Sequence, residues 1–168
     1  MIRFFLTLFV ALPLLAAAQA KIGVVNSVEI FNTMPEKVAA DTLMKHRSSK
    51  SKAELDRIQN EFNNKFADYQ EVASDAATPE AIKERRIQEL HTLDKDIQAF
   101  QQSEQKALDD YRAQLVNPIL DRIQKAIEEV SEEMSLDIVF DTAKTPVAYT
   151  GPYTEDITPR VKARLAKK

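Results

Sequence analysis

The residues of this sequence with the clearest chemical potential are four carboxylates close together, Glu128, Glu129, Glu132 and Glu133. Carboxylate oxygens bind divalent cations, but a calcium site needs about six or more converging oxygen ligands. One face of a helix presents only a pair of these four carboxylates. The cluster therefore predicts a solvated helix face and no metal site.

The sequence also offers few residues for metal binding through His or Cys, or for nucleophilic catalysis. His46 and His91 are the only histidines, neither has a second ligand at a metal-site spacing, and both are expected at exposed positions. The absence of Cys excludes disulfides and thiolate metal sites. The sequence has no Gly-rich phosphate-binding loop and no Gly-x-Ser-x-Gly elbow. We therefore predict a protein that is not an enzyme and needs no cofactor.

Residues 1–20 have the features of a secretory signal peptide. Arg3 is followed by an uncharged, mostly apolar run that ends in Ala18-Gln19-Ala20, a motif suited to signal peptidase. A membrane anchor is the alternative, but the run is shorter than the roughly 20 residues of a spanning helix. We predict cleavage after Ala20, and the lack of Cys in an exported chain favours the bacterial periplasm.

The mature chain is predicted to be acidic. Arg3 is the only charged residue among the first 20, so its removal takes the formal net charge from -3 to -4. An acidic balance argues against nucleic-acid binding. Two local basic groups remain, and the second is a candidate patch for an anionic ligand, with a solvated helix face as the alternative: Lys45, Arg47, Lys50 and Lys52; Lys83, Arg85 and Arg86.

The middle of the chain predicts a first long helix from Glu36 to about Ser74, a stretch without Gly or Pro. Residues 45–52 carry no apolar stripe, so this part of the helix is expected to be exposed to solvent. Further along, apolar residues recur at steps of three and four, as on one face of a helix: Leu55, Ile58, Phe62, Phe66, Tyr69 and Val72.

A second long helix follows a break at residues 75–79. Thr78 is a plausible N-cap and Pro79 suits the first helical position. The apolar stripe then continues to about Ser135, with Pro118 inside the helix, where we expect a bend. Two helices joined by a short break hide their stripes by packing antiparallel. Because each helix of about 40 residues would be roughly 60 Å long, part of this hairpin must project into solvent.

Both ends of the chain predict short strands. These are residues 21–26, 136–141 and 146–150, and a last helix begins near Asp156. The fold class is thus α+β, mostly α: a hairpin arm over residues 36–117, with its tip near 75–79, projects from a body formed by residues 21–35 and 118–168. Open sheet edges favour symmetric assembly. The predicted core of the assembled body is Ile22, Val24, Leu136, Ile138, Phe140, Val147 and Tyr149.

Several segments resemble the Skp/OmpH family over essentially the whole predicted mature chain. They are KIGVVN, NPILDRIQKAIEEVSEE leading into LDIVFDT, then PVAYT and EDITPRVKARL, in that order. The resemblance implies a homotrimer whose terminal strands form a central body, with three helical arms around a cavity. It also implies an ATP-independent holdase for unfolded outer-membrane proteins in the periplasm, with possible weak contact to a membrane surface or lipopolysaccharide. The best-known members are strongly basic, and this chain differs from them in its acidic balance.

The apolar residues of the arm have two interpretations. They either pack between the two helices or contact an unfolded client: Phe62, Phe66, Tyr69, Leu93, Ile97 and Phe100. The alternative function is a coiled-coil spacer or adaptor of the cell envelope. A spacer should show an unbroken apolar seam over several heptads, and both the polar stretch at 45–52 and Pro118 argue against one.

Overall fold

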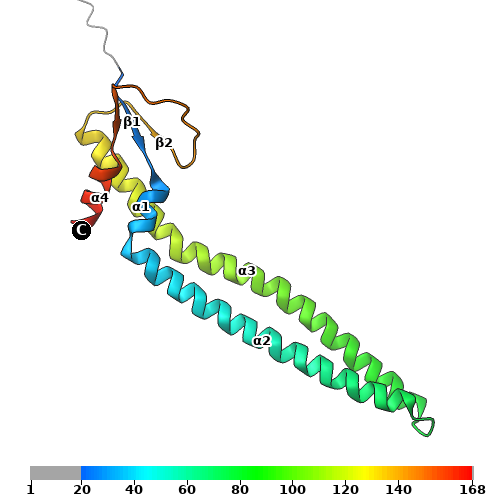
Figure 1. Cartoon of the computed structure of the whole chain (residues 1–168). Helices are drawn as coiled ribbons and strands as arrows, with labels where there is room; N and C mark the ends of the chain where they lie inside the picture. Colours follow the sequence, from blue (N-terminus) through cyan, green and yellow to red (C-terminus); the bar gives the residue numbers. More distant parts are fainter. Residues whose placement is uncertain (1–19, 168) are drawn as a thin grey trace, which may run out of the picture.

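The protein consists of two long helices that project from a small body of short strands and helices (Figure 1). The computed structural model describes residues 20–167, so the predicted signal peptide, apart from Ala20, lies outside the described residues. The predicted fold class is confirmed as mostly helical, with long helices and a small body that contains the strands. The elements are β1 (Ile22–Val25), α1 (Ser27–Thr33), α2 (Pro35–Ser74), α3 (Glu80–Glu133), β2 (Ile138–Asp141), β3 (Thr154–Asp156) and α4 (Thr158–Ala166).

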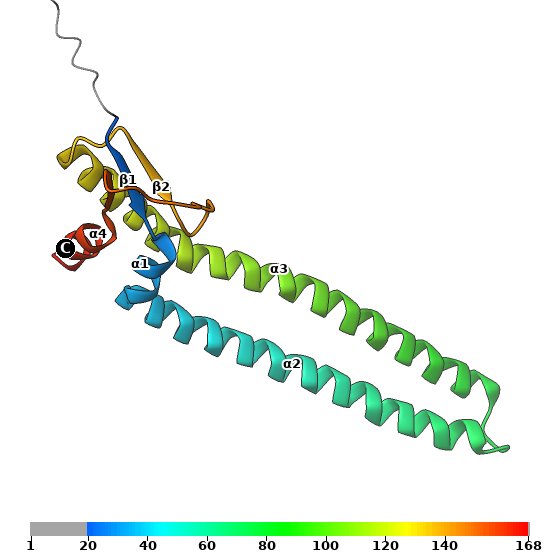
Figure 2. The same ribbon diagram turned by 45° about the horizontal axis from the view of Figure 1, so that its top comes forward.

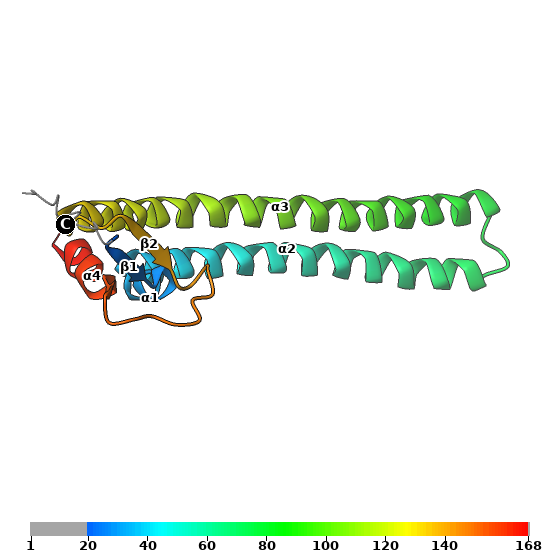
Figure 3. The same cartoon turned by 90° about the horizontal axis from the view of Figure 1, so that it is seen from above.

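Helices α2 and α3 form the predicted antiparallel hairpin. They contain 40 and 54 residues, and α2 is therefore about 60 Å long. Figures 2 and 3 show the two helices side by side up to their connection at the tip. Helix α3 continues through Pro118 without interruption. Within residues 20–167, no helix combines the length and the apolar character that a membrane-spanning segment requires.

The arm has almost no buried interior. Only Ala40 and Ser51 are buried in α2, and the buried residues of α3 begin at Ile119. A pair of helices can cover each other's apolar stripe on one side only, since no third element lies over the pair. The stripe residues of the arm consequently remain partly exposed, whereas those of α3 beyond Pro118 are packed in the body.

The turn at the tip differs in detail from the prediction. Helix α3 begins at Glu80, with Pro79 rather than Thr78 at the N-cap position. Thr78 instead donates its hydroxyl hydrogen to Asp75 Oδ2 at 2.8 Å, and Asp75 Oδ1 accepts from the Ala77 N–H at 2.9 Å. The hydrogen bond from Ala77, followed by that from Thr78, holds the pKa of Asp75 below its ordinary value. The tip is therefore organised around the carboxylate of Asp75.

The sheet has three parallel strands in the order β2-β1-β3. The predicted strand at residues 146–150 is wrong, because these residues lie in the loop between β2 and β3. Both β2 and β3 run parallel to β1 on opposite edges, so the chain leaving β2 must travel back along the sheet before β3 can start. Residues 142–153 make this return (Figure 1), and they leave Tyr149 82% exposed.

One face of the sheet packs on α3. Gly23 belongs to this face, where a Cβ atom would lie only 2.8 Å from Leu136 Cδ1, so glycine permits the close approach. Val25 and Val139 also face inward. Together with α1, the start of α2, the end of α3 and α4, they form one core, whose buried members are Val25, Ile30, Met34, Ala40, Ile119, Ile123, Ala126, Val130, Ile157, Val161 and Leu165.

The opposite face of the sheet carries most of the residues predicted as body core. We call Ile22, Val24, Ile138 and Phe140 the outer sheet face, since Ile138 is 49% and Phe140 40% exposed in the single chain. None of the seven residues predicted for the core of the assembled body is in the buried core of the single chain, although Leu136 is partly buried and packs against that core. The alternation of apolar residues in a strand separates two faces, but it does not say which face α3 covers.

Arg122 connects the root of the arm to the body. Its guanidinium forms an ion pair with Glu36 in the first turn of α2. Arg122 Nη2 also donates to the carbonyl oxygen of Leu165 in α4 at 3.0 Å. The side chain thus ties three helices together where the hairpin leaves the core.

Candidate functional site

An apolar groove lies between the two helices near the tip of the arm. It has a volume of about 430 Å³. Phe62 and Phe66 stack in it, with ring centroids 6.3 Å apart and planes 5° from parallel, and Phe66 is 42% exposed. We call this the tip groove, and its lining residues are Phe62, Phe66 and Tyr69 from α2 and Ile87, Leu90, His91 and Asp94 from α3.

The tip groove contains half of the arm residues singled out in the sequence. Leu93, Ile97 and Phe100 are half-buried along α3 and do not line it. Ile87 was missed, although it precedes Leu90 by three residues and so continues the α3 stripe. His91 is exposed, as predicted, but it borders the groove together with Asp94.

Each cation of the candidate anionic-ligand patch is paired with a carboxylate. Lys83 Nζ lies 4.0 Å from Glu80 Oε2, whereas Arg85 Nε and Arg86 Nη1 lie 3.2 Å and 3.0 Å from the two oxygens of Glu89. The hydrogen bond from Arg86 is the main cause that lowers the pKa of Glu89. An anionic ligand would have to displace these carboxylates, which weakens the case for such a site.

The polar stretch at residues 45–52 is not wholly exposed, which corrects the prediction. Ser51 is buried against α3 and donates to Glu104 Oε1 at 2.5 Å. Arg47 Nη2 lies 2.5 Å from the same oxygen, and Arg47 Nη1 donates to Ser51 Oγ at 2.8 Å. This polar clasp replaces apolar packing between α2 and α3, so the apolar seam expected of a coiled-coil spacer is interrupted here.

The acidic cluster at the end of α3 has a structural role. Glu129 Oε2 lies 3.1 Å from Arg164 Nη1, and Glu133 pairs with Nη2 of the same guanidinium. Glu128 accepts from Gln124 Nε2 at 3.0 Å. The two ion pairs of Arg164 tie α4 to α3. Over residues 20–167, no group of three or more His, Cys, Asp or Glu side chains is placed to hold a metal ion.

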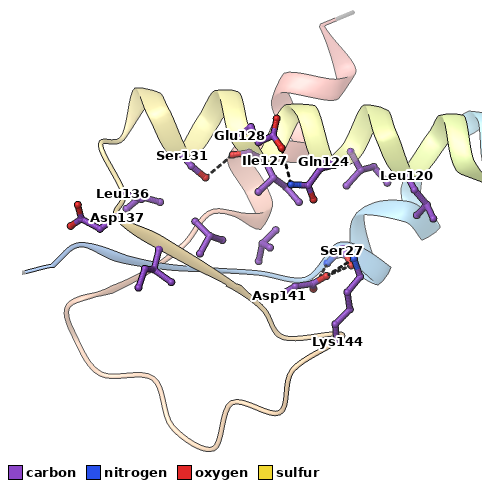
Figure 4. A pocket seen from close by; sticks show the side chains of 14 residues that line it. Ser27, Leu120, Gln124, Ile127, Glu128, Ser131, Leu136, Asp137, Asp141 and Lys144 are labelled. Atoms are coloured by element: carbon purple, nitrogen blue, oxygen red, sulfur yellow. Dashed lines mark hydrogen bonds and ion pairs between the residues drawn. The ribbon is translucent and has the colours of Figure 1, made fainter.

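A second cavity, of about 300 Å³, lies between β2 and α3 (Figure 4). Its polar end is Asp141, whose Oδ2 accepts from Ser27 Oγ at 2.5 Å and whose Oδ1 accepts from the Ser27 N–H at 3.1 Å. Burial by itself would raise the pKa of the Asp141 carboxyl. Hydrogen bonds from Ser27 and from the Ala143 N–H outweigh burial, so this pKa lies below its ordinary value. Asp141 therefore anchors β2 to the start of α1.

Replacing Asp141 by Asn is expected to lower the free energy of unfolding by about 1–3 kcal/mol at pH 7, because charge-assisted hydrogen bonds to Ser27 are lost. A depressed pKa in the folded state contributes stability above the unfolded-state pKa of about 3.9, and this contribution is lost as the pH falls through the folded-state value. The difference between wild type and Asp141→Asn should thus narrow below about pH 4. Urea unfolding at several pH values checks this, and a difference that persists unchanged at acidic pH would contradict it.

Comparison with known proteins identifies the family. Residues 21–165 match the family model described as outer membrane protein (OmpH-like). The chain is 31% identical over 145 residues to chaperone protein Skp of Photorhabdus luminescens, which covers 84% of each protein. It is 26% identical over 148 residues to chaperone protein Skp of Escherichia coli K12, which covers 88% of each protein.

The fold also has a solved counterpart. An outer membrane chaperone (OmpH-like) from Caulobacter crescentus superimposes with a TM-score of 0.71 at 18% identity, over 90% of this chain and 87% of that one. The relatives are named as chaperones, which agrees with the prediction that the protein is not an enzyme. With a hairpin arm, a three-stranded body and a family match over nearly its whole length, the chain belongs to the OmpH-like family of Skp chaperones.

Proposed function

We propose that this protein is an ATP-independent holdase of the periplasm that binds unfolded outer-membrane proteins between the arms of a homotrimer. The observation that carries the proposal is the arm itself. Between Ala40 and Ile119 no apolar side chain is buried, although the stripe residues continue along both helices. A long surface of partly exposed apolar groups, kept soluble by charges, suits weak contact with many unfolded segments.

The proposed assembly uses the body. The outer sheet face exposes Ile138 and Phe140, and the edge strands β2 and β3 each pair only with β1 in the described chain. Packing three such faces together would bury this apolar surface and protect the open edges, which otherwise invite pairing with other chains. In this proposal residues 21–35 and 118–168 form the trimer body, with Leu136 and the loop residues Val147 and Tyr149 close to the interface.

The proposed location rests on the N-terminal sequence. The family match begins at Lys21, the residue that would follow cleavage after Ala20. Export would place the chain in the compartment that unfolded outer-membrane proteins must cross. Contact with lipopolysaccharide is not included, because Lys83, Arg85 and Arg86 are already paired with Glu80 and Glu89.

The test is suppression of aggregation. An unfolded outer-membrane β-barrel protein is diluted from urea with or without the mature chain, and light scattering is followed over time. An equimolar amount of trimer should suppress scattering, and adding ATP should change nothing. Unchanged scattering in the presence of the protein would rule out the holdase activity.

Within the arm, client binding should be spread over many side chains. Single replacements such as Leu93→Ser or Ile97→Ser are expected to weaken client binding by less than about fivefold, since each removes at most about 1 kcal/mol of a distributed contact surface. Titration of a labelled unfolded β-barrel protein measures this. Loss of all binding in one such variant would point to a single dominant site instead.

A further inference from the structure

We propose that the tip groove is a docking site for segments of unfolded chain in which an aromatic or large aliphatic side chain lies next to Lys or Arg. This inference rests on the proposed holdase function and names the client segment that this chain prefers. Its basis is the combination of an open apolar floor with an excess of negative charge at the same end of the arm.

The apolar floor has the dimensions of side chains. A cavity of about 430 Å³ between Phe66 and Leu90 can take one or two large side chains. The parallel rings of Phe62 and Phe66 offer an aromatic face for stacking. A stable interface between folded proteins involves roughly 20–30 residues a side, whereas seven residues line the groove, so the groove fits a short extended segment better than a folded partner.

The excess charge of the predicted mature chain is concentrated at the tip. Residues 61–96 contain nine Asp or Glu and five Lys or Arg, a net charge of -4. Residues 21–168 as a whole carry the same net charge, so the rest of the chain is neutral. An acidic end on an otherwise neutral molecule attracts cationic groups and repels anionic ones.

Within the described residues, ion pairs involve only three of these nine carboxylates, Glu61, Glu80 and Glu89. Four of the five cations, Lys65, Lys83, Arg85 and Arg86, are paired with only two carboxylates, Glu80 and Glu89. Several other carboxylates form no ion pair within the described chain: Asp68, Glu71, Glu84 and Asp96.

One carboxylate lies in the groove wall itself. Asp94 lines the tip groove beside His91, and its Oδ2 accepts from Gln98 Nε2 at 2.9 Å. A Lys or Arg next to the bound apolar side chain could therefore reach Asp94, or lie over the ring of Tyr69 in a cation–π contact. An acidic segment, or an anionic membrane surface, would be repelled by the same groups.

The experiment compares two labelled 12-residue peptides with the same Phe and Leu in a Gly/Ser background. In one peptide two Lys flank the apolar pair, and in the other two Glu do. Fluorescence anisotropy with the full mature protein should show at least about fivefold tighter binding of the Lys peptide at about 20 mM salt, with the preference shrinking near 300 mM because exposed charges are screened.

Substitutions in the tip groove test whether the preference for the Lys peptide arises there. Phe66→Ser should weaken both peptides about equally, whereas Asp94→Asn should weaken only the Lys peptide. Ile82→Ser is the matched control, because Ile82 is 45% exposed, as Phe66 is 42%, but lies outside the groove. Circular dichroism verifies that each variant keeps its helix content.

Equal binding of the two peptides, a preference for the Glu peptide, or no effect of Phe66→Ser would overturn the proposal. So would failure of the Lys peptide to bind up to about 1 mM. The light-scattering assay is run on the same preparation. If aggregation is suppressed but the Lys peptide is not preferred, the tip groove is not the proposed docking site and the holdase function stands. If aggregation is not suppressed, the holdase function itself is contradicted.

Discussion

Replacing Phe140 by Glu is expected to convert the proposed trimer into monomers. Phe140 is 40% exposed in the single chain and lies on the outer sheet face beside Val24. In the proposed trimer this surface is covered, so the change would bury an unpaired carboxylate at each interface. Such a charge costs at least about 3 kcal/mol, or more than a hundredfold in association. Sedimentation equilibrium at micromolar concentration should show the mass of one chain instead of three.

The matched control for this change is Ile82→Glu. Ile82 has a similar exposed fraction, 45%, but lies on the arm, so the variant should keep the wild-type mass. A wild-type protein that is itself monomeric would contradict the trimer. A trimeric Phe140→Glu variant would instead show that another surface holds the chains together.

Replacing Ile157 by Ala is expected to lower the free energy of unfolding by about 2–5 kcal/mol. Ile157 is fully buried where β3 meets α4, and its N–H donates to the Val24 carbonyl at 2.9 Å. Truncation leaves a cavity between the sheet and the helices, in a body with few other buried residues. Since a small domain has a total stability of only about 5–15 kcal/mol, this is a large fraction. Urea unfolding followed by circular dichroism measures it.

The comparison requires a second isoleucine and a fixed protein concentration, because assembly contributes to apparent stability. Ile82→Ala removes the same atoms from a half-exposed position and should change the free energy of unfolding by about 1 kcal/mol or less. Similar losses in the two variants would mean that burial in the body does not dominate stability.

The amino-acid sequence by itself determined the hairpin. Its two apolar stripes have the period of an α-helix, and the only Pro between Pro35 and Pro118 is Pro79, at the break. These are local signals, so α2, the tip and α3 lie where they were predicted. Strands β1 and β2 also follow from short β-branched runs. The lack of catalytic motifs agreed with relatives that are named as chaperones.

The tertiary structure decided which surfaces these elements hide. The periodicity of β1 and β2 gives two faces, and only the position of α3 makes Val25 and Val139 the inner ones. The third strand is Thr154–Asp156 and not the predicted 146–150. Its parallel pairing on the far edge of β1 requires a return loop, and residues 146–150 lie in that loop. Such pairing joins residues more than a hundred positions apart, which no local pattern encodes.

In the arm, too, contacts between residues far apart in the sequence decide which side chains are covered. Arg47 and Ser51 lie in a polar stretch that predicts solvent exposure, and only the facing helix shows that Glu104 is their partner. The tip groove likewise exists only because Phe66 on α2 and Leu90 on α3 come together at one height of the hairpin. Sequence periodicity specifies the face of each helix, but the register between two helices is set by contacts across them, and that register decides which side chains form a site.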